Sequence, residues 1–91
     1  MALDYATPVT DGIAGWITEQ VADYVGIAPT ELHPTMPLAE YGLDSVSAVG
    51  LCGDIERKFQ IAVDPTMVFD YPTIDRIARF IAAEAAAGAS W

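Results

Sequence analysis

Apolar residues recur at helical spacing in the first part of the chain. Between residues 11 and 25 they follow the i, i+3, i+4 pattern of an amphipathic helix, at Ile13, Trp16, Ile17, Val21, Tyr24 and Val25. Thr10 or Asp11 can cap the start of this helix, and Gly26 can close its end. The pattern therefore predicts a first helix over residues 11–25.

A second helix is predicted over residues 45–59. With about 100° of rotation per residue, its core stripe consists of Ala48, Leu51, Cys52, Ile55 and Phe59. Val46, Val49 and Gly53 fall together on a neighbouring face, on the same side as Ser45. This helix is therefore expected to have one face for the core and a second apolar face that the core does not use.

Prolines divide the rest of the chain. Residues 26–43 form a long connection with three prolines, and we expect apolar anchors to pack it over the helices, namely Ile27, Leu32, Met36 and Leu38. Between Pro65 and Pro72 there is room for one or two helical turns. Thr73 is expected to cap a last helix over residues 74–87.

The predicted fold is all-α. No stretch alternates with period two for long enough to form a sheet, so we expect a small three-to-four-helix bundle with a long loop between helices 1 and 2. The folded domain is expected over residues 10–86, with a flexible N-terminal segment at 1–9 and a flexible tail or linker stub at 87–91. The aromatic residues assigned to the core are Trp16, Phe59, Phe69 and Phe80.

Length and composition agree with one small globular domain. The chain has 91 residues and 53% apolar residues, too many for a disordered segment. No apolar run reaches the roughly 18–20 residues of a membrane span. The start, "MALDYATPVTDG", lacks the basic and apolar regions of a signal peptide, so a cytoplasmic location is expected.

Charge narrows the choice of partners. Thirteen acidic residues face four basic ones, which gives a net charge of −9. Nucleic acid and anionic membrane surfaces would repel such a chain, whereas partners with basic patches would attract it. The charge also keeps an apolar small domain in solution, and composition does not separate these two interpretations.

Catalytic and metal-binding chemistry is poorly supported. One cysteine excludes an intrachain disulfide, and a single His with a single Cys does not make a zinc site. Ser45 lies in G-L-D-S-V and not in a G-x-S-x-G elbow, and the only histidine, His33, lies in the long connection. Cys52 belongs to the core stripe, where a buried and unreactive thiol is expected. No enzyme is predicted.

Ser45 is the residue that most needs an explanation. Either Ser45 or Asp44 can cap the second helix by accepting from its first free N–H groups. A cap does not account for the apolar residues around it, Leu43, Val46 and Val49. An exposed apolar patch beside a polar side chain is typical of a contact surface.

Two longer sequence motifs carry a resemblance to a known family. "PLAEYGLDSVSAVGL" followed by "VFDYPTIDRIARFIA" resembles the acyl carrier protein domains of polyketide synthases, from about Ile13 to Glu84. The family implies a carrier and not a catalyst. A phosphopantetheinyl transferase moves 4′-phosphopantetheine from coenzyme A onto a serine, here Ser45, and the terminal thiol of the arm holds acyl groups as thioesters.

The resemblance also implies roles for neighbouring residues. Asp44 matches the acid that the transferase reads, and Leu43 lies beside the attachment point. The docking surface implied by the family comprises Leu43, Val46, Val49, Met67 and Val68, with Gly50 on the same helix. Implied partners are the transferase, ketosynthase, acyltransferase or fatty acyl-AMP ligase, thioesterase and other synthase domains, and a free-standing carrier is expected to be monomeric.

Two departures from the family pattern matter. Many relatives have Glu where this chain has Gly50, and Arg-Asn where it has Cys52-Gly53. The second helix is less acidic than in the dissociated fatty-acid carriers, which favours docking through apolar contacts with fewer salt bridges.

Peptidyl carriers of nonribosomal synthetases are the closest alternative, but they usually show Gly-Gly-His/Asp-Ser before the helix. A carrier fold that serves only as a docking module is a further alternative, against which the intact Ser45 argues.

Overall fold

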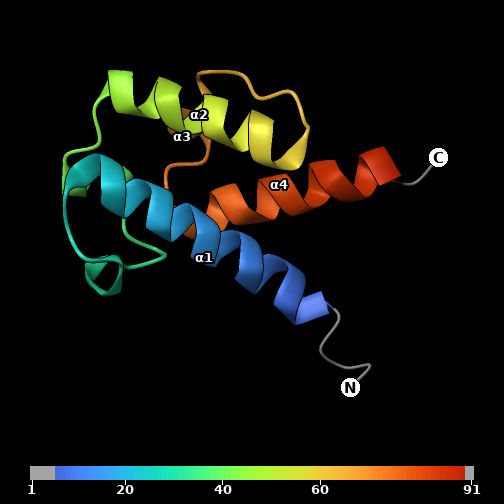
Figure 1. The fold of residues 1–91 in the computed structure, drawn as a ribbon, viewed down its shortest axis with the longest axis horizontal. Coiled ribbons are helices and arrows are strands. Elements are labelled where there is room, and N and C mark those ends of the chain that lie inside the picture. Colours follow the sequence, from blue (N-terminus) through green and yellow to red (C-terminus); the bar gives the residue numbers. More distant parts are fainter. Residues whose placement is uncertain (1–5, 90–91) are drawn as a thin grey trace.

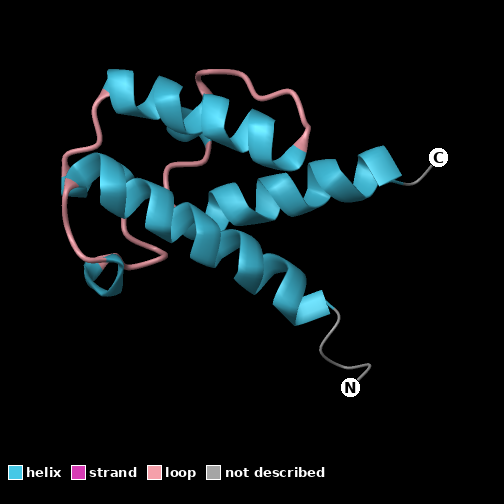
Figure 2. Cartoon of the chain, in the orientation of Figure 1, coloured by secondary structure: helices cyan, strands magenta, loops and turns pink. Residues whose placement is uncertain are grey.

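Residues 6–89 are described in the computed structural model, and they form helices and loops without a strand (Figure 2). The α-helices are α1 (Ala6–Val25), α2 (Ser45–Phe59), α3 (Met67–Asp70) and α4 (Ile74–Ala89). Two short 3₁₀ helices, η2 (Pro29–Glu31) and η3 (Leu38–Tyr41), lie in the connection between α1 and α2. The prediction of an all-α bundle with a long loop between the first two long helices is confirmed.

The longest helix, α1, packs chiefly against α4. Figure 1 shows the two helices in contact near the middle of the molecule and diverging toward the N-terminal end of α1 and the C-terminal end of α4. In the same view α2 lies on one side of this pair, and α3 packs against α2.

The core is built from the stripes that the sequence pattern selects. Side chains with no exposed surface include Ile17 and Val21 of α1, Leu51 and Ile55 of α2, and three residues of α4, Ile74, Ile77 and Ile81. Trp16 and Phe59 are only partly buried and stack edge to face at the rim, with ring centroids 5.3 Å apart. Burying these apolar surfaces together is the main source of stability for so small a domain.

The long connection is fixed to the start of α4. Leu32 and Leu38 are buried, as expected, whereas Met36 is 41% exposed. The N–H of Leu38 donates to the carbonyl of Pro72 at 2.8 Å, and the N–H of Asp75 donates to the carbonyl of Pro34 at 2.9 Å. These bonds join the connection to Pro72, just before α4, and to the first turn of α4, and so fix the start of η3 there.

Both long terminal helices extend beyond their predicted limits. The expected start at residue 11 is wrong, because α1 begins at Ala6 and includes Pro8 in its first turn. A proline fits there because the first N–H groups of a helix have no partner within the helix. The last helix continues to Ala89, through a run of alanines that favours helix over tail. Residues 1–5 and 90–91 of the expected flexible ends lie outside the described residues.

No helix within residues 6–89 is both long enough and apolar enough to cross a membrane.

Candidate functional site

Ser45 is the first residue of α2, and its side chain is exposed. The chain reaches it through Gly42, which closes η3 with a φ of 87°. That left-handed conformation is costly for any residue with a Cβ, so glycine is the residue that suits this turn. The turn therefore places Ser45 at the N-terminal end of α2, where the helix dipole is positive.

The cap of α2 is Asp44 and not Ser45. Its carboxylate Oδ1 accepts from the N–H of Ser47 at 2.8 Å. This bond holds the pKa of Asp44 below its usual range. The charged cap therefore stabilises the fold above the ordinary carboxyl pKa, and that contribution is lost as the pH falls through the lowered pKa. Because Asp44 caps the helix, the hydroxyl of Ser45 is not needed for the cap.

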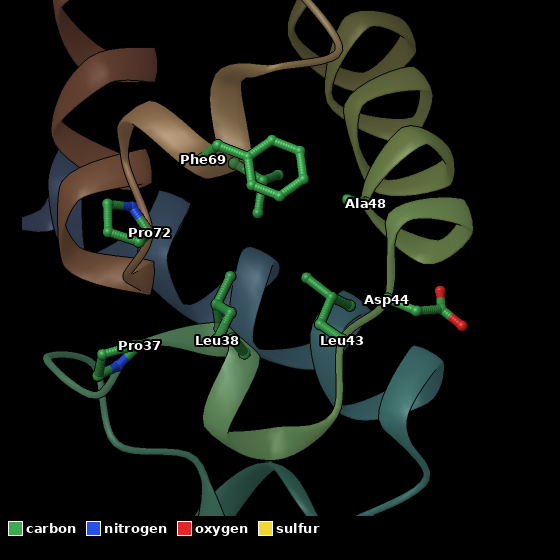
Figure 3. A pocket seen from close by; sticks show the side chains of 9 residues that line it. Pro37, Leu38, Leu43, Asp44, Ala48, Phe69 and Pro72 are labelled. Carbon is green, nitrogen blue, oxygen red and sulfur yellow. The ribbon is translucent and has the colours of Figure 1, made fainter.

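An apolar hollow of about 130 Å³ opens beside the start of α2. Figure 3 shows it between η3, the first turn of α2 and α3, with Leu38, Leu43 and Phe69 around it and the carboxylate of Asp44 directed away from it. Ala48 lines the wall that α2 contributes. The hollow therefore lies next to Ser45 and presents mostly carbon.

The apolar face of α2 lies where the sequence pattern places it. Val46 is 80% exposed and Val49 is 54% exposed, so neither belongs to the core. Met67 and Val68 of the next helix are buried, although Val68 lines the hollow, so their part in docking stays a prediction. The exposed apolar side chain of α3 is Phe69, at 67%, which corrects its assignment to the core.

Gly50 faces α1 and is not an open docking position. A Cβ at residue 50 would lie 2.6 Å from the Tyr24 hydroxyl, which crosses this position to donate to Asp54 at 2.7 Å. The bond to Asp54, together with partial burial, raises the pKa of Tyr24 to about 12. The stabilisation that comes with it is present below pH about 10 and is lost as the pH rises toward that raised value. Nothing in the sequence pattern links Tyr24 with Asp54, thirty residues away.

The other candidate chemical groups do not assemble at Ser45. His33 is exposed in the long connection, where its backbone N–H donates to the Tyr41 hydroxyl at 2.8 Å. Cys52 is 3% exposed, and burial raises the pKa of its thiol, as do the nearby carboxylates of Glu56 and Asp64. No group of three or more potential metal ligands occurs among the described residues.

Comparison with known proteins assigns the chain to a family. The family model described as "Phosphopantetheine attachment site" matches residues 15–81. The 5-methyl-1-naphthoate synthase of Streptomyces sahachiroi is 38% identical over 66 residues, which are 72% of this chain and 4% of that protein. Mycoketide-CoA synthase of Mycobacterium tuberculosis is 31% identical over 75 residues, 81% of this chain and 2% of that protein. The chain thus spans only a few per cent of the length of these curated relatives.

Solved structures show the same fold. A free-standing peptidyl carrier protein from an Acinetobacter baumannii secondary metabolic pathway superposes with a TM-score of 0.80 at 31% identity, over 82% of this chain and 94% of that one. The A1-type ACP domain from module 5 of MLSA1 gives a TM-score of 0.77 at 25% identity, over 87% and 80% of the two chains. The chain therefore belongs to the phosphopantetheine attachment site family and is a non-catalytic carrier domain of the polyketide synthase type, in a family whose members carry 4′-phosphopantetheine covalently.

Proposed function

We propose that Ser45 carries the 4′-phosphopantetheine arm and that the domain holds acyl or polyketide intermediates for partner enzymes. The observation that carries this proposal is the exposed side chain of Ser45 at the first position of α2, inside the matched residues 15–81. Asp44 already caps the helix, so attachment at Ser45 leaves the cap in place.

The residues around Ser45 fit a phosphodiester with an extended arm. The positive end of the α2 dipole favours the negative charge of the phosphate. The apolar hollow beside Leu43 and Phe69 offers a wall along which apolar parts of the arm or cargo can rest. When bound, the group supplies a terminal thiol that holds acyl chains as thioesters.

The attachment step uses one atom of this chain. Ser45 Oγ forms a new bond to the phosphorus that bears the pantetheine of coenzyme A, and adenosine 3′,5′-bisphosphate leaves. The hydroxyl proton of Ser45 passes to a base of the transferase. The domain itself contributes an accessible hydroxyl on a rigid helix start, and the chemistry is that of its partner.

The partners follow from the carrier role as further proposals. They are the phosphopantetheinyl transferase, and then a ketosynthase, an acyltransferase or fatty acyl-AMP ligase, and a thioesterase. The relatives named above are synthases, which supports such partners for this domain. A monomeric state, a cytoplasmic location and a domain limit at residues 10–86 stay predictions.

The test is intact mass after incubation with coenzyme A and a broad-specificity phosphopantetheinyl transferase. We expect the mass of one phosphopantetheinyl group to be added to the wild-type protein and none to be added to Ser45→Ala. Ser47→Ala is the matched control, since Ser47 lies two residues further along α2, and it should be modified like the wild type. The same gain in Ser45→Ala would refute the attachment point, and no gain in the wild type would leave a docking module.

A peptidyl carrier is the second candidate. It is favoured by the structural similarity to a free-standing peptidyl carrier protein at 31% identity. The sequence Tyr41-Gly42-Leu43-Asp44-Ser45 instead follows the polyketide pattern. The two can be separated by loading the arm chemically with an acyl or an aminoacyl group. Transfer of the acyl group to a ketosynthase supports the first function, and preferential use of the aminoacyl form by a condensation domain supports the second.

A further inference from the structure

A second hollow, distinct from the one beside Ser45, opens on the outer side of α4. It has a volume of about 510 Å³, and it is lined by Tyr71, Arg76, Arg79, Phe80, Ala83 and Glu84. No residue lines both hollows. The surface on α4 is therefore a separate feature of the molecule.

Opposite charges lie on either side of an aromatic ring on this surface. Arg76, Phe80 and Glu84 follow one another at intervals of four residues, so they lie along one side of the helix. Tyr71 packs against Phe80 with the ring centroids 4.9 Å apart, and both rings are partly buried. We call the surface formed by Arg76, Phe80, Ala83 and Glu84 the α4 face.

The two charged ends of the α4 face are exposed. Among the described residues, the side chains of Arg76 and Glu84 take part in no ion pair. Arg79, the next cation of this helix, is instead paired with Asp75 at 3.1 Å. Arg76 and Glu84 are therefore available to a partner that carries the opposite charges in matching places.

An antiparallel copy of α4 carries these charges in the reverse order. When two such helices pair about Phe80, the four residues on each side of the ring span the same length, about 6 Å along the axis. Arg76 of each copy then lies opposite Glu84 of the other, and the two phenyl rings meet at the centre. The α4 face is thus complementary to itself under a two-fold axis.

We propose that two copies of this chain associate through the α4 face as a weak two-fold dimer. Phe80 and Ala83 supply little apolar surface, and exposed ion pairs contribute little. A net charge of −9 on each copy opposes association. The dimer therefore forms only near about 1 mM, a concentration that tethering of two domains in one assembly provides, and a dilute free carrier stays monomeric.

Sedimentation equilibrium of the apo wild-type protein tests the association. The weight-average mass is measured between about 0.05 mM and about 1 mM protein in about 0.15 M sodium chloride. At the highest concentration we expect at least about 1.3 times the monomer mass. A smaller value at that concentration would overturn the proposal.

Charge reversal locates the contact and separates it from the effect of net charge. Arg76→Glu makes the net charge two units more negative, and Glu84→Arg makes it two units less negative. Each substitution places like charges opposite each other, so both variants should sediment as monomers. The double variant Arg76→Glu/Glu84→Arg has the wild-type net charge with both pairs reversed, and it should regain at least about half of the wild-type increase in mass.

Glu19→Arg is the matched control, because it makes the same charge change as Glu84→Arg at an exposed position of α1. It should associate at least as strongly as the wild type. If Glu84→Arg also associated as strongly as the wild type, or if the double variant stayed monomeric while circular dichroism showed it to be folded, the α4 face would not be the contact.

This inference does not depend on the proposed function of Ser45. Ser45→Ala should associate like the wild type, since Ser45 does not line the α4 hollow. Absence of phosphopantetheine attachment would therefore leave the dimer in place, and a monomeric wild type would leave the attachment in place.

Discussion

Cys52 is the only cysteine of the chain, and the fold shields it. Its Sγ lies 3.7 Å from the carbonyl oxygen of Asp64 and 3.9 Å from that of Pro65, with 3% of the residue exposed. Burial and two nearby carboxylates raise the pKa of the thiol, so little thiolate exists at neutral pH. In a carrier whose arm ends in a thiol, the shielding of Cys52 makes the thiol of the arm the reactive one.

Thiol reactivity provides the test at this scale. We expect Cys52 of the native apo protein to react with a disulfide reagent at least about 100-fold more slowly than the same protein in denaturant, because the thiol must be exposed by local unfolding first. The protein with phosphopantetheine attached should show one additional, rapidly reacting thiol. Release of the coloured thiolate measures both rates. A native apo protein that reacts as fast as the denatured one would contradict the shielding.

Whether the exposure of a single residue could be predicted depended on the length of the helix that contains it. The exposure of Val46 and Val49 followed from a helix of 15 residues, over which rotation angles are well defined. The four residues of α3 are too few for such a count, and so the burial of Met67 and Val68 and the exposure of Phe69 were missed. The choice between Asp44 and Ser45 as cap also required coordinates, since both residue types suit that role.

The two glycines within α2 have different surroundings, although they are three residues apart. At Gly50 a Cβ would lie 2.6 Å from the Tyr24 hydroxyl, so a side chain there must displace the end of Tyr24. At Gly53 a Cβ would meet only a guanidinium nitrogen of Arg57, at an ordinary distance of 3.5 Å. The packing of the described residues therefore opposes a side chain at the first position but not at the second.

Alanine substitutions distinguish the two positions. Gly53→Ala should raise the free energy of unfolding by about 1 kcal/mol, the usual difference in helix propensity. Gly50→Ala should give no gain or a loss, because the new methyl group displaces Tyr24 and breaks its hydrogen bond to Asp54. Urea denaturation followed by circular dichroism measures both.

Removing Tyr24 supplies the control for this pair. In a Tyr24→Ala background the obstruction at residue 50 is gone, so Gly50→Ala should gain about as much as Gly53→Ala does. Equal stabilisation by both substitutions in the wild-type background would mean that Tyr24 does not exclude a side chain at residue 50.

At the level of whole helices, the interiors were predictable and the ends were not. Apolar periodicity defined the core sides of α1, α2 and α4, since burial requires each helix to keep one continuous apolar stripe. α1 begins at Ala6, but the polar and small residues before residue 11 are compatible with a helix and with a loop alike. The sequence pattern therefore does not predict this start. Thr73 was correctly expected to cap α4, and its hydroxyl accepts from the N–H of Arg76 at 3.1 Å.

The net negative charge of the whole molecule is expected to lower its stability. Thirteen acidic side chains share one small domain with four basic ones. The described residues form two ion pairs, Asp54 with Arg57 and Asp75 with Arg79, each within a single helix and partly exposed. Pairs of this kind contribute little. Repulsion among the remaining carboxylates is therefore expected to exceed the attraction that salt would weaken.

Sodium chloride should consequently stabilise the fold. Screening that recovers about 1 kcal/mol would raise Tm by about 4–8 °C for a domain of this size, measured by thermal denaturation between about 0.01 M and about 0.5 M salt. The double variant Glu19→Gln/Asp23→Asn removes two exposed charges of α1, and it should have a higher Tm at low salt and a smaller response to added salt. A Tm that falls with salt would mean that the ion pairs outweigh the repulsion, and the two neutralised residues would then lower Tm as well.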